Sequence, residues 1–334
     1  MNLRIVSVFI VLISVMSNFK KNIQGKPVLT AMMITLLGIS AFPVFAAEKA
    51  VSNDCGSHNV AAYEVHEWGV IVGCDQSEDY LLTSRPLRIN FVKEPVLYFH
   101  SKDKKPFALR VTFNQGNPTE TYPEATKNGN TLSWERVAFT AATPPVETKG
   151  LRLFDAGLVN FNEIIDTLND VDADEVESNG VKARFLFYEG EMPFVNQIKT
   201  TYDVTTKKAT VVNNGVYPVY DLFVLVPDGL DANDFIFPRD PLLAYLPQLK
   251  PGETVRVQPE AITKKVDFAK SLRDLGFTDK ESAAFDSLWS ESFLRSGKLL
   301  YRLPQDECDR LINLEFTPCP QKISRALYVL VKES

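Results

Sequence analysis

Between residues 63 and 194, apolar and polar positions alternate in short runs, which is the pattern of half-buried β-strands. Glycine, asparagine and proline separate the runs, as in residues 114–118 and 127–130, and such clusters mark turns. Short strands joined by turns predict an antiparallel β-sandwich. The strands expected in this section are residues 92–101, 107–113, 119–122, 131–139 and 181–188.

A second β section is expected from residue 198 to residue 261. Two turns divide it, Asn213-Asn214-Gly215 and Pro251-Gly252-Glu253. The section resembles a small immunoglobulin-like module, in which a strand, an Asn-Asn-Gly turn, a long apolar strand and a Leu-x-Pro-Gly-Glu-x-Val edge follow one another. Its expected strands are residues 199–204, 209–213, 219–226 and 254–259.

After residue 263 the apolar period lengthens from two towards 3.6, which indicates helices. One helix is expected over residues 266–275. The run Thr278-Asp279-Lys280-Glu281 has the pattern of a capping box, with Thr278 at the N-cap and Glu281 reaching back, and it opens a longer helix that ends at Gly297. A strand at 299–303, a short helix at 304–311 with proline at its first position, and a closing strand at 323–331 complete the tail.

These patterns predict a mainly β fold with a C-terminal α+β part. An antiparallel β-sandwich is followed by an immunoglobulin-like module and a small tail of helices and strands. The expected segments are a signal peptide at residues 1–46, a β-sandwich domain at 47–195, the immunoglobulin-like module at 196–262 and the C-terminal α/β region at 263–334.

The N-terminal segment has the layout of a secretory signal peptide. An apolar stretch at residues 27–45 follows three lysines and ends in the small residues Ala46 and Ala47, as a cleavage site requires. Translation starting at Met16 gives the same layout. The alternative is an uncleaved anchor that tethers the same domain outside the cytoplasmic membrane. The sequence thus predicts a periplasmic or secreted protein with no membrane span in the mature chain.

The charge of the mature chain argues against nucleic acid as a partner. The full chain has 36 basic and 42 acidic residues, and residues 1–46 contain four of the basic ones and none of the acidic ones, so the mature net charge is 32 − 42 = −10. Nucleic-acid binding needs a basic face that neutralises phosphates. A protein or glycan of the cell envelope is the expected partner.

The four cysteines fit the oxidising compartment that a signal peptide implies. Cys55 and Cys74 flank one expected strand, and Cys308 and Cys319 flank a short C-terminal loop. Two local disulfides, Cys55–Cys74 and Cys308–Cys319, are the simplest of the three possible pairings. Zinc ligation by these cysteines is the alternative, and no C-x-x-C spacing supports it.

His66 and Glu67 stand side by side in an apolar run, an unusual place for two proton-handling groups. Neighbours in a strand point to opposite faces, so His66 is expected beside Trp68 and Val70, and Glu67 beside Val65. Both side chains would be at least partly buried, and buried polar groups need partners.

This pair is the candidate catalytic site, with Glu67 as a general acid or base. The alternative is a structural Glu67 that pairs with a basic residue such as Arg136 or caps backbone amides.

His58, His66 and His100 are the three histidines of the chain and a candidate set of metal ligands. Three imidazoles can hold zinc or copper and leave one position open. Their spacing matches no metal motif, and His66 lies on an expected strand, unlike the helical H-E-x-x-H pair. If the strands of His66 and His100 pair, the two rings can meet. Structural packing and acid–base work are the alternatives, and no cofactor is predicted outright.

Tyr98, Tyr122, Trp134 and Tyr188 are candidates for an exposed groove that binds sugar or peptide, although aromatic residues at strand spacing are more often core. The sequence contains neither a G-x-S-x-G nucleophile elbow nor a phosphate-binding glycine loop. It does not decide whether the protein is an enzyme, and it favours a non-enzymatic role.

Several segments, taken in order, resemble a family of uncharacterised, mostly secreted bacterial proteins with an H-E-W-G start, a P-V-x-Y-F-Y strand, a T-E-x-Y-P turn and an F-L-F-Y-x-G strand. The resemblance implies export and a modular β architecture without naming a reaction. This chain has His100 where the family has tyrosine, so the family does not imply a metal site that includes His100. The matching residues here are 65–69, 95–100, 119–123, 134 and 185–190, with further matches near the C-terminus.

Two functions follow from these observations. The first is a non-enzymatic exported protein that binds protein or glycan in the envelope. The second is a periplasmic hydrolase, or a zinc or copper protein, centred on His66 and Glu67.

Overall fold

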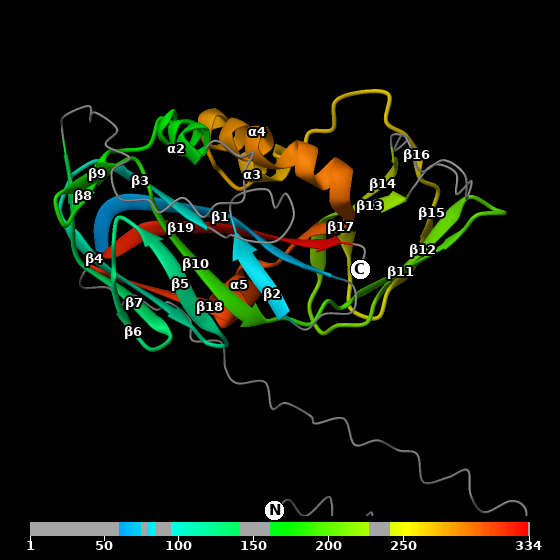
Figure 1. Cartoon of the computed structure of the whole chain (residues 1–334), viewed down its shortest axis with the longest axis horizontal. Coiled ribbons are helices and arrows are strands. Elements are labelled where there is room, and N and C mark those ends of the chain that lie inside the picture. Colours follow the sequence, from blue (N-terminus) through cyan, green and yellow to red (C-terminus); the bar gives the residue numbers. More distant parts are fainter. Residues whose placement is uncertain (1–59, 75–78, 84–94, 141–160, 227–240, 333–334) are drawn as a thin grey trace, which may run out of the picture. The chain divides into compact units, whose positions relative to one another are not determined.

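Strands from the two ends of the folded chain lie side by side at the centre of the largest sheet. In the computed structural model, β1 (Val60–Cys74) pairs in parallel with β19 (Cys319–Lys332), from Val60 opposite Cys319 to Cys74 opposite Lys332 (Figure 1). Both strands are apolar on both faces over most of their length, as expected of central strands covered on two sides. The structure describes residues 60–74, 79–83, 95–140, 161–226 and 241–332.

The largest sheet has ten strands among the described residues, and the β1–β19 pair is parallel while its other pairings are antiparallel. Strand β3 (Val96–Ser101) also pairs with β1, and β5 (Asn117–Tyr122) pairs with β10 (Leu186–Pro193). The order is β16 (Glu260–Ala261), β14 (Leu242–Leu249), β13 (Val219–Val226), β17 (Gly297–Arg302), β19, β1, β2 (Asp79–Thr83), β10 (Leu186–Pro193) and β3 (Val96–Ser101).

Two smaller sheets complete the β structure of the described residues. The first follows the order β18 (Ile312–Thr317), β4 (Phe107–Phe113), β7 (Thr131–Phe139), β8 (Val176–Ser178) and β9 (Val181–Ala183), with β6 (Thr126–Asn128) beside β7. The second consists of β11 (Ile198–Asp203), β12 (Lys208–Asn213) and β15 (Thr254–Val257).

The largest sheet separates two hydrophobic cores. On one face, β1 packs with α2 (Phe161–Asn169), α3 (Lys270–Asp274) and α4 (Asp279–Ser296), and Figure 1 shows these three helices along the same side of the sheet. On the other face, β1 packs with strands of the six-stranded sheet and with α5 (Gln305–Leu311). We call these the helix-side core and the strand-side core.

The mainly β fold class with C-terminal helices is confirmed. Strands β4, β7 and β13 have the expected bounds, and α4 begins just after Thr278 and ends just before Gly297, as the capping box and the glycine predict. Pro304 differs slightly from expectation, because it is the N-cap residue of α5 and not its first helical residue.

The strands of the expected immunoglobulin-like module divide between two sheets. Three of them, β11, β12 and β15, form the three-stranded sheet, whereas β13 joins the largest sheet beside β14 and β17. The described residues all belong to one compact unit, Lys49–Ser334, and the boundaries at residues 195 and 262 stay predictions within it. The expected signal peptide at residues 1–46 lies outside the described residues.

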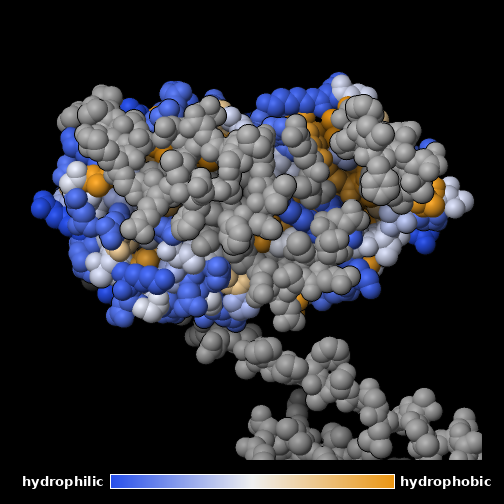
Figure 2. All heavy atoms as spheres, in the orientation of Figure 1, coloured by the Kyte–Doolittle hydropathy of each residue, from blue (hydrophilic) through white to orange (hydrophobic). Residues whose placement is uncertain are grey.

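The surface is mixed in character. In the view of Figure 2, hydrophobic residues occur in separate groups among hydrophilic ones. In the part of the chain that the structure describes, no helix has the length and apolar composition needed to cross a membrane. The exposed large hydrophobic side chains of that part are Val60, Val195, Val204, Val216 and Tyr245.

Candidate metal centre

Strand β1 sends His66 and Glu67 into different cores. His66 is 4% exposed and faces the helix-side core together with Trp68 and Val70, whereas Glu67 is 0% exposed and lies on the side of Val65, in the strand-side core. This confirms the expected parity and the burial of both groups. The two residues therefore take part in separate polar clusters.

Pairing of β1 with β3 brings His66 and His100 together. The antiparallel register sets His66 opposite Tyr98, so His100, two residues further along β3, points to the same face. The centroids of the two imidazole rings are 4.7 Å apart. The expectation that these rings can meet if their strands pair is confirmed.

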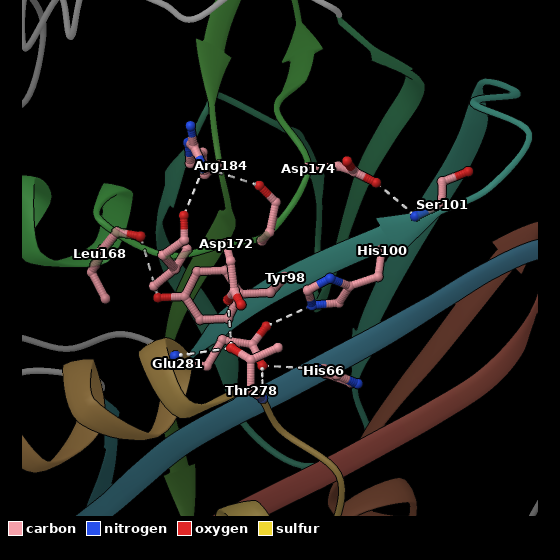
Figure 3. A network of polar contacts seen from close by, with 12 residues as sticks. His66, Tyr98, His100, Ser101, Leu168, Asp172, Asp174, Arg184, Thr278 and Glu281 are labelled. Carbon is pink, nitrogen blue, oxygen red and sulfur yellow. Dashed lines mark hydrogen bonds and ion pairs between the residues drawn. The ribbon is translucent and has the colours of Figure 1, made fainter.

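The third member of the cluster is Glu281, from the first turn of α4. Its Oε2 atom accepts a hydrogen bond from the Thr278 backbone N–H at 2.8 Å, and the Thr278 Oγ1 atom accepts one from the Glu281 backbone N–H at 3.2 Å. This is the reciprocal pair of a capping box. The box turns a completely buried carboxylate towards β1 and β3 (Figure 3).

One carboxylate thus binds both histidines. The Nδ1 atom of His66 lies 2.9 Å from Glu281 Oε2, and the Nε2 atom of His100 lies 2.8 Å from Glu281 Oε1. The other ring nitrogen of His66, Nε2, is buried and has no hydrogen-bond partner among the described residues. A buried polar atom without a hydrogen-bond partner is usually satisfied by a bound water, ion or ligand.

Electrostatics keep the Glu281 carboxylate ionised. Burial alone would raise its pKa, but hydrogen bonds from His100 and His66 outweigh burial and lower the pKa to about 2. For His100, burial would lower the pKa, and the hydrogen bond to Glu281 with the charges of Asp172 and Asp174 raises it. The cluster is therefore an anionic carboxylate between two imidazoles.

All three residues are of types that commonly bind metal ions in proteins. One donor atom from each of His66, His100 and Glu281 can be chosen so that all lie within 4.8 Å of one another. Zinc takes imidazole nitrogen at about 2.0–2.1 Å and carboxylate oxygen at about 2.0–2.2 Å, which at tetrahedral angles separates ligand atoms by about 3.4 Å. The nitrogen–oxygen distances of 2.8 and 2.9 Å must widen by about half an ångström to reach that spacing. Donor atoms that lie up to 4.8 Å apart must in turn move closer together.

Glu281 is added to the predicted ligand set, and the place of His58 in that set stays a prediction. Two of the three predicted histidines, His66 and His100, are brought together, and His58 lies outside the described residues. Glu281 was expected only as a helix cap. The capping-box pattern was a signal that this glutamate is oriented, but the sequence did not indicate that the start of α4 lies over β1 and β3.

Glu67 belongs to a second buried cluster on the other side of the sheet. Its Oε2 atom accepts a hydrogen bond from Arg325 Nε at 2.5 Å, its Oε1 atom accepts one from the Tyr188 hydroxyl, and both ion-pair side chains are 0% exposed. Arg325 also donates to Asp309 Oδ1 and to the Ile312 carbonyl, each at 2.7 Å.

The expected structural pairing of Glu67 with a basic residue is present, but the partner is Arg325 and not Arg136. Parallel pairing explains the choice, since Arg325 lies directly opposite Glu67 in the β1–β19 register. A shared catalytic site of Glu67 and His66 does not form, because the sheet separates them.

The four aromatic candidates are core residues. Tyr98 and Tyr122 lie in the helix-side core, Trp134 and Tyr188 lie in the strand-side core, and the largest exposed fraction among them is 8%. The prediction of an exposed aromatic groove is therefore wrong. Aromatic side chains at strand spacing face inward here because both faces of the largest sheet are covered.

The predicted Cys308–Cys319 disulfide is wrong. Cys308 is a free thiol, completely buried on α5, and burial raises its pKa to about 12. Cys319 is disulfide-bonded. Cys55 and the side chain of Cys74 lie outside the described residues, so the predicted Cys55–Cys74 pairing does too.

No protein-family model and no curated protein matches the sequence. Among solved structures, the chain is similar to the μ-homology domain of yeast δ-COP-I in complex with a Dsl1 WxWxV peptide. The identity is 7%, the TM-score is 0.30, and the match covers 81% of this chain and 96% of that chain. A likeness at this level carries no argument about site or function.

Proposed function

We propose that the protein is an exported metalloprotein that holds one divalent transition-metal ion, zinc in the first place, on His66, His100 and Glu281. The observation that carries the proposal is the convergence of these three donors from β1, β3 and α4 on one buried point. Two imidazoles and one carboxylate are an established zinc-ligand combination.

A purely structural use of the cluster is the rival. It accounts for the two hydrogen bonds to Glu281, and, like zinc ligation through Nδ1, it leaves the Nε2 atom of His66 buried without a partner among the described residues. Burial of such an atom without a hydrogen bond costs about 1–3 kcal/mol. A water molecule bound at Nε2 would remove that cost in either case, so metal binding itself has to decide between the two interpretations.

The other function considered for the chain, recognition of an envelope protein or glycan, has less support. The four aromatic residues that would form its groove are buried. Export is part of the proposal on the grounds of the N-terminal sequence layout.

The direct test is a zinc titration of the metal-stripped mature chain, residues 47–334, with zinc as the only metal ion. Copper is left out because it outcompetes zinc at most nitrogen and oxygen sites. We expect one bound zinc per chain and stabilisation against unfolding of about 2.7 kcal/mol at a free zinc concentration one hundred times the Kd.

Matched variants locate the site. His66→Ala and Glu281→Gln should lose the zinc, whereas His58→Ala should keep it. A chain that binds no zinc would overturn the proposal. Loss on His58→Ala together with retention on Glu281→Gln would overturn the ligand set.

A further inference from the structure

Three protein ligands leave the coordination of a zinc ion incomplete. A structural site fills the fourth tetrahedral position with a protein side chain, whereas a catalytic site leaves it to water or substrate. The neighbours of the cluster therefore decide which kind of site this is.

Asp172 is the acidic side chain next to this set, joined to it through Thr278, although its carboxylate is not among the donor atoms that lie within 4.8 Å of one another. It lies on the segment between α2 and β8, and its Oδ1 atom accepts a hydrogen bond from the Thr278 hydroxyl at 2.6 Å. Thr278 in turn donates its backbone N–H to Glu281 Oε2. Figure 3 shows Asp172 grouped with Tyr98, His100, Thr278 and Glu281.

The backbone around Asp172 is held in place on both sides. Arg184 donates from Nη1 to the Val171 carbonyl at 2.6 Å and to the Ala173 carbonyl at 3.5 Å. The side chains of Val171 and Ala173 are buried, while Asp172 itself is exposed. The alternation turns the Asp172 side chain away from the side of Val171 and Ala173, and its hydrogen-bond partner there is the Thr278 hydroxyl.

The two neighbouring acids are already engaged with basic or backbone groups. Asp174 accepts a hydrogen bond from the Ser101 backbone N–H at 2.6 Å and pairs with Lys104, and Asp170 pairs with Lys280 at 3.3 Å. For Asp172, the described residues provide the Thr278 hydroxyl as partner and no basic side chain. Of the three acids, it is the one without an ion pair among the described residues.

Charge balance favours the same residue. A divalent ion on two neutral imidazoles and one carboxylate leaves one net positive charge next to the helix-side core. Burial of an uncompensated charge is costly, and a second carboxylate removes it.

We infer that Asp172 is the fourth ligand, so that the centre is a closed site of two histidines and two carboxylates. The inference rests on the proposed function. On metal binding, the Asp172 carboxylate leaves the Thr278 hydroxyl and displaces a water molecule from the ion. A closed centre of this kind stores the ion or stabilises the fold.

The test uses the mature chain loaded with Co²⁺, whose visible absorption reports coordination number and ligand exchange. Azide is the probe, because it enters an open position and shifts the spectrum. We expect the wild-type spectrum to be insensitive to azide and that of Asp172→Asn to shift. Asp174→Asn is the matched control, because Asp174 is bound to Ser101 and Lys104. Its spectrum should be as insensitive to azide as that of the wild type.

The outcomes separate the two proposals. A wild-type chain that takes up no cobalt would overturn both of them. If the wild type binds cobalt and its spectrum responds to azide in the same way as that of Asp172→Asn, only the assignment of Asp172 as the fourth ligand is overturned. Circular dichroism of each variant tests whether the fold is kept after the substitution.

Discussion

His100 Nε2 lies 2.8 Å from Glu281 Oε1, although 181 positions separate the two residues in the chain. The contact joins β3 to the first turn of α4, and the same carboxylate receives His66 from β1. Because Glu281 is also the closing residue of the capping box, helix capping and candidate metal ligation meet in one side chain.

The two roles of Glu281 can be separated by substitution. Glutamine is accepted in a capping box, so Glu281→Gln should keep α4 capped and lose zinc binding. Thr278→Ala should weaken the cap of α4 and lower the unfolding free energy by about 0.5–2 kcal/mol. Its zinc affinity should change less than that of Glu281→Gln. Zinc titration and denaturant unfolding of both variants measure the two effects. Wild-type zinc affinity in Glu281→Gln would contradict the assignment.

His100→Tyr replaces one imidazole of the cluster by a phenol ring. The His100 side chain is 26% exposed, so a ring of similar width can be placed there with the fold kept. Tyrosine cannot replace imidazole as a zinc ligand at neutral pH, and loss even of an outer partner weakens zinc binding about 10–100-fold. We expect at least that loss in a zinc titration, with an unchanged circular dichroism spectrum. Retained affinity would exclude His100 as a ligand.

The Glu67–Arg325 pair should matter for stability and not for metal binding. Loss of one partner from a buried ion pair leaves an uncompensated charge and costs about 3–5 kcal/mol. Arg325→Met should therefore lower the unfolding free energy by about that amount, and the double variant Glu67→Leu with Arg325→Met should regain part of it. Both should bind zinc as the wild type does, provided that they fold, because the pair lies on the opposite face of β1. Additive losses in the double variant would argue against a coupled pair.

The burial of Cys308 and the position of Cys319 predict which cysteine reacts and which pair forms a disulfide. Burial raises the pKa of the Cys308 thiol to about 12, so at pH 8 the reactive thiolate is scarce and shielded. Iodoacetamide should modify Cys308 only after unfolding. The β1–β19 register places Cys74 opposite Lys332, thirteen residues beyond Cys319, so peptide mapping should join Cys319 to Cys55. Rapid alkylation of Cys308 in the folded protein would contradict its buried position.

Local patterns in the sequence were sufficient for much of the fold. Period-two alternation gave β4 and β7 their bounds, a long apolar run gave those of β13, and the capping box with Gly297 gave those of α4. Strand β18 was missed although Ile312, Leu314 and Phe316 alternate with polar residues, because its start directly follows a helix. Helix α2 was missed as well, although its buried residues Ile164, Ile165 and Leu168 have helical spacing.

Contacts between elements far apart in the chain could not be predicted from the sequence. Strand parity correctly assigned His66 and Glu67 to different faces, but their partners Glu281 and Arg325 come from elements more than 200 positions away. Arg325 follows from the parallel contact between β1 and β19, which no local pattern encodes. The disulfide prediction failed for a related reason, since nearness in sequence said nothing about Cys308 pointing into the strand-side core.

The most direct test of the metal centre is anomalous diffraction from crystals of the zinc-loaded mature chain, measured on both sides of the zinc absorption edge. We expect one strong peak bounded by His66, His100 and Glu281, at about 2.0–2.2 Å from a nitrogen of each ring and from a carboxylate oxygen. A zinc peak elsewhere, or none at this cluster with the two hydrogen bonds to Glu281 intact, would contradict it.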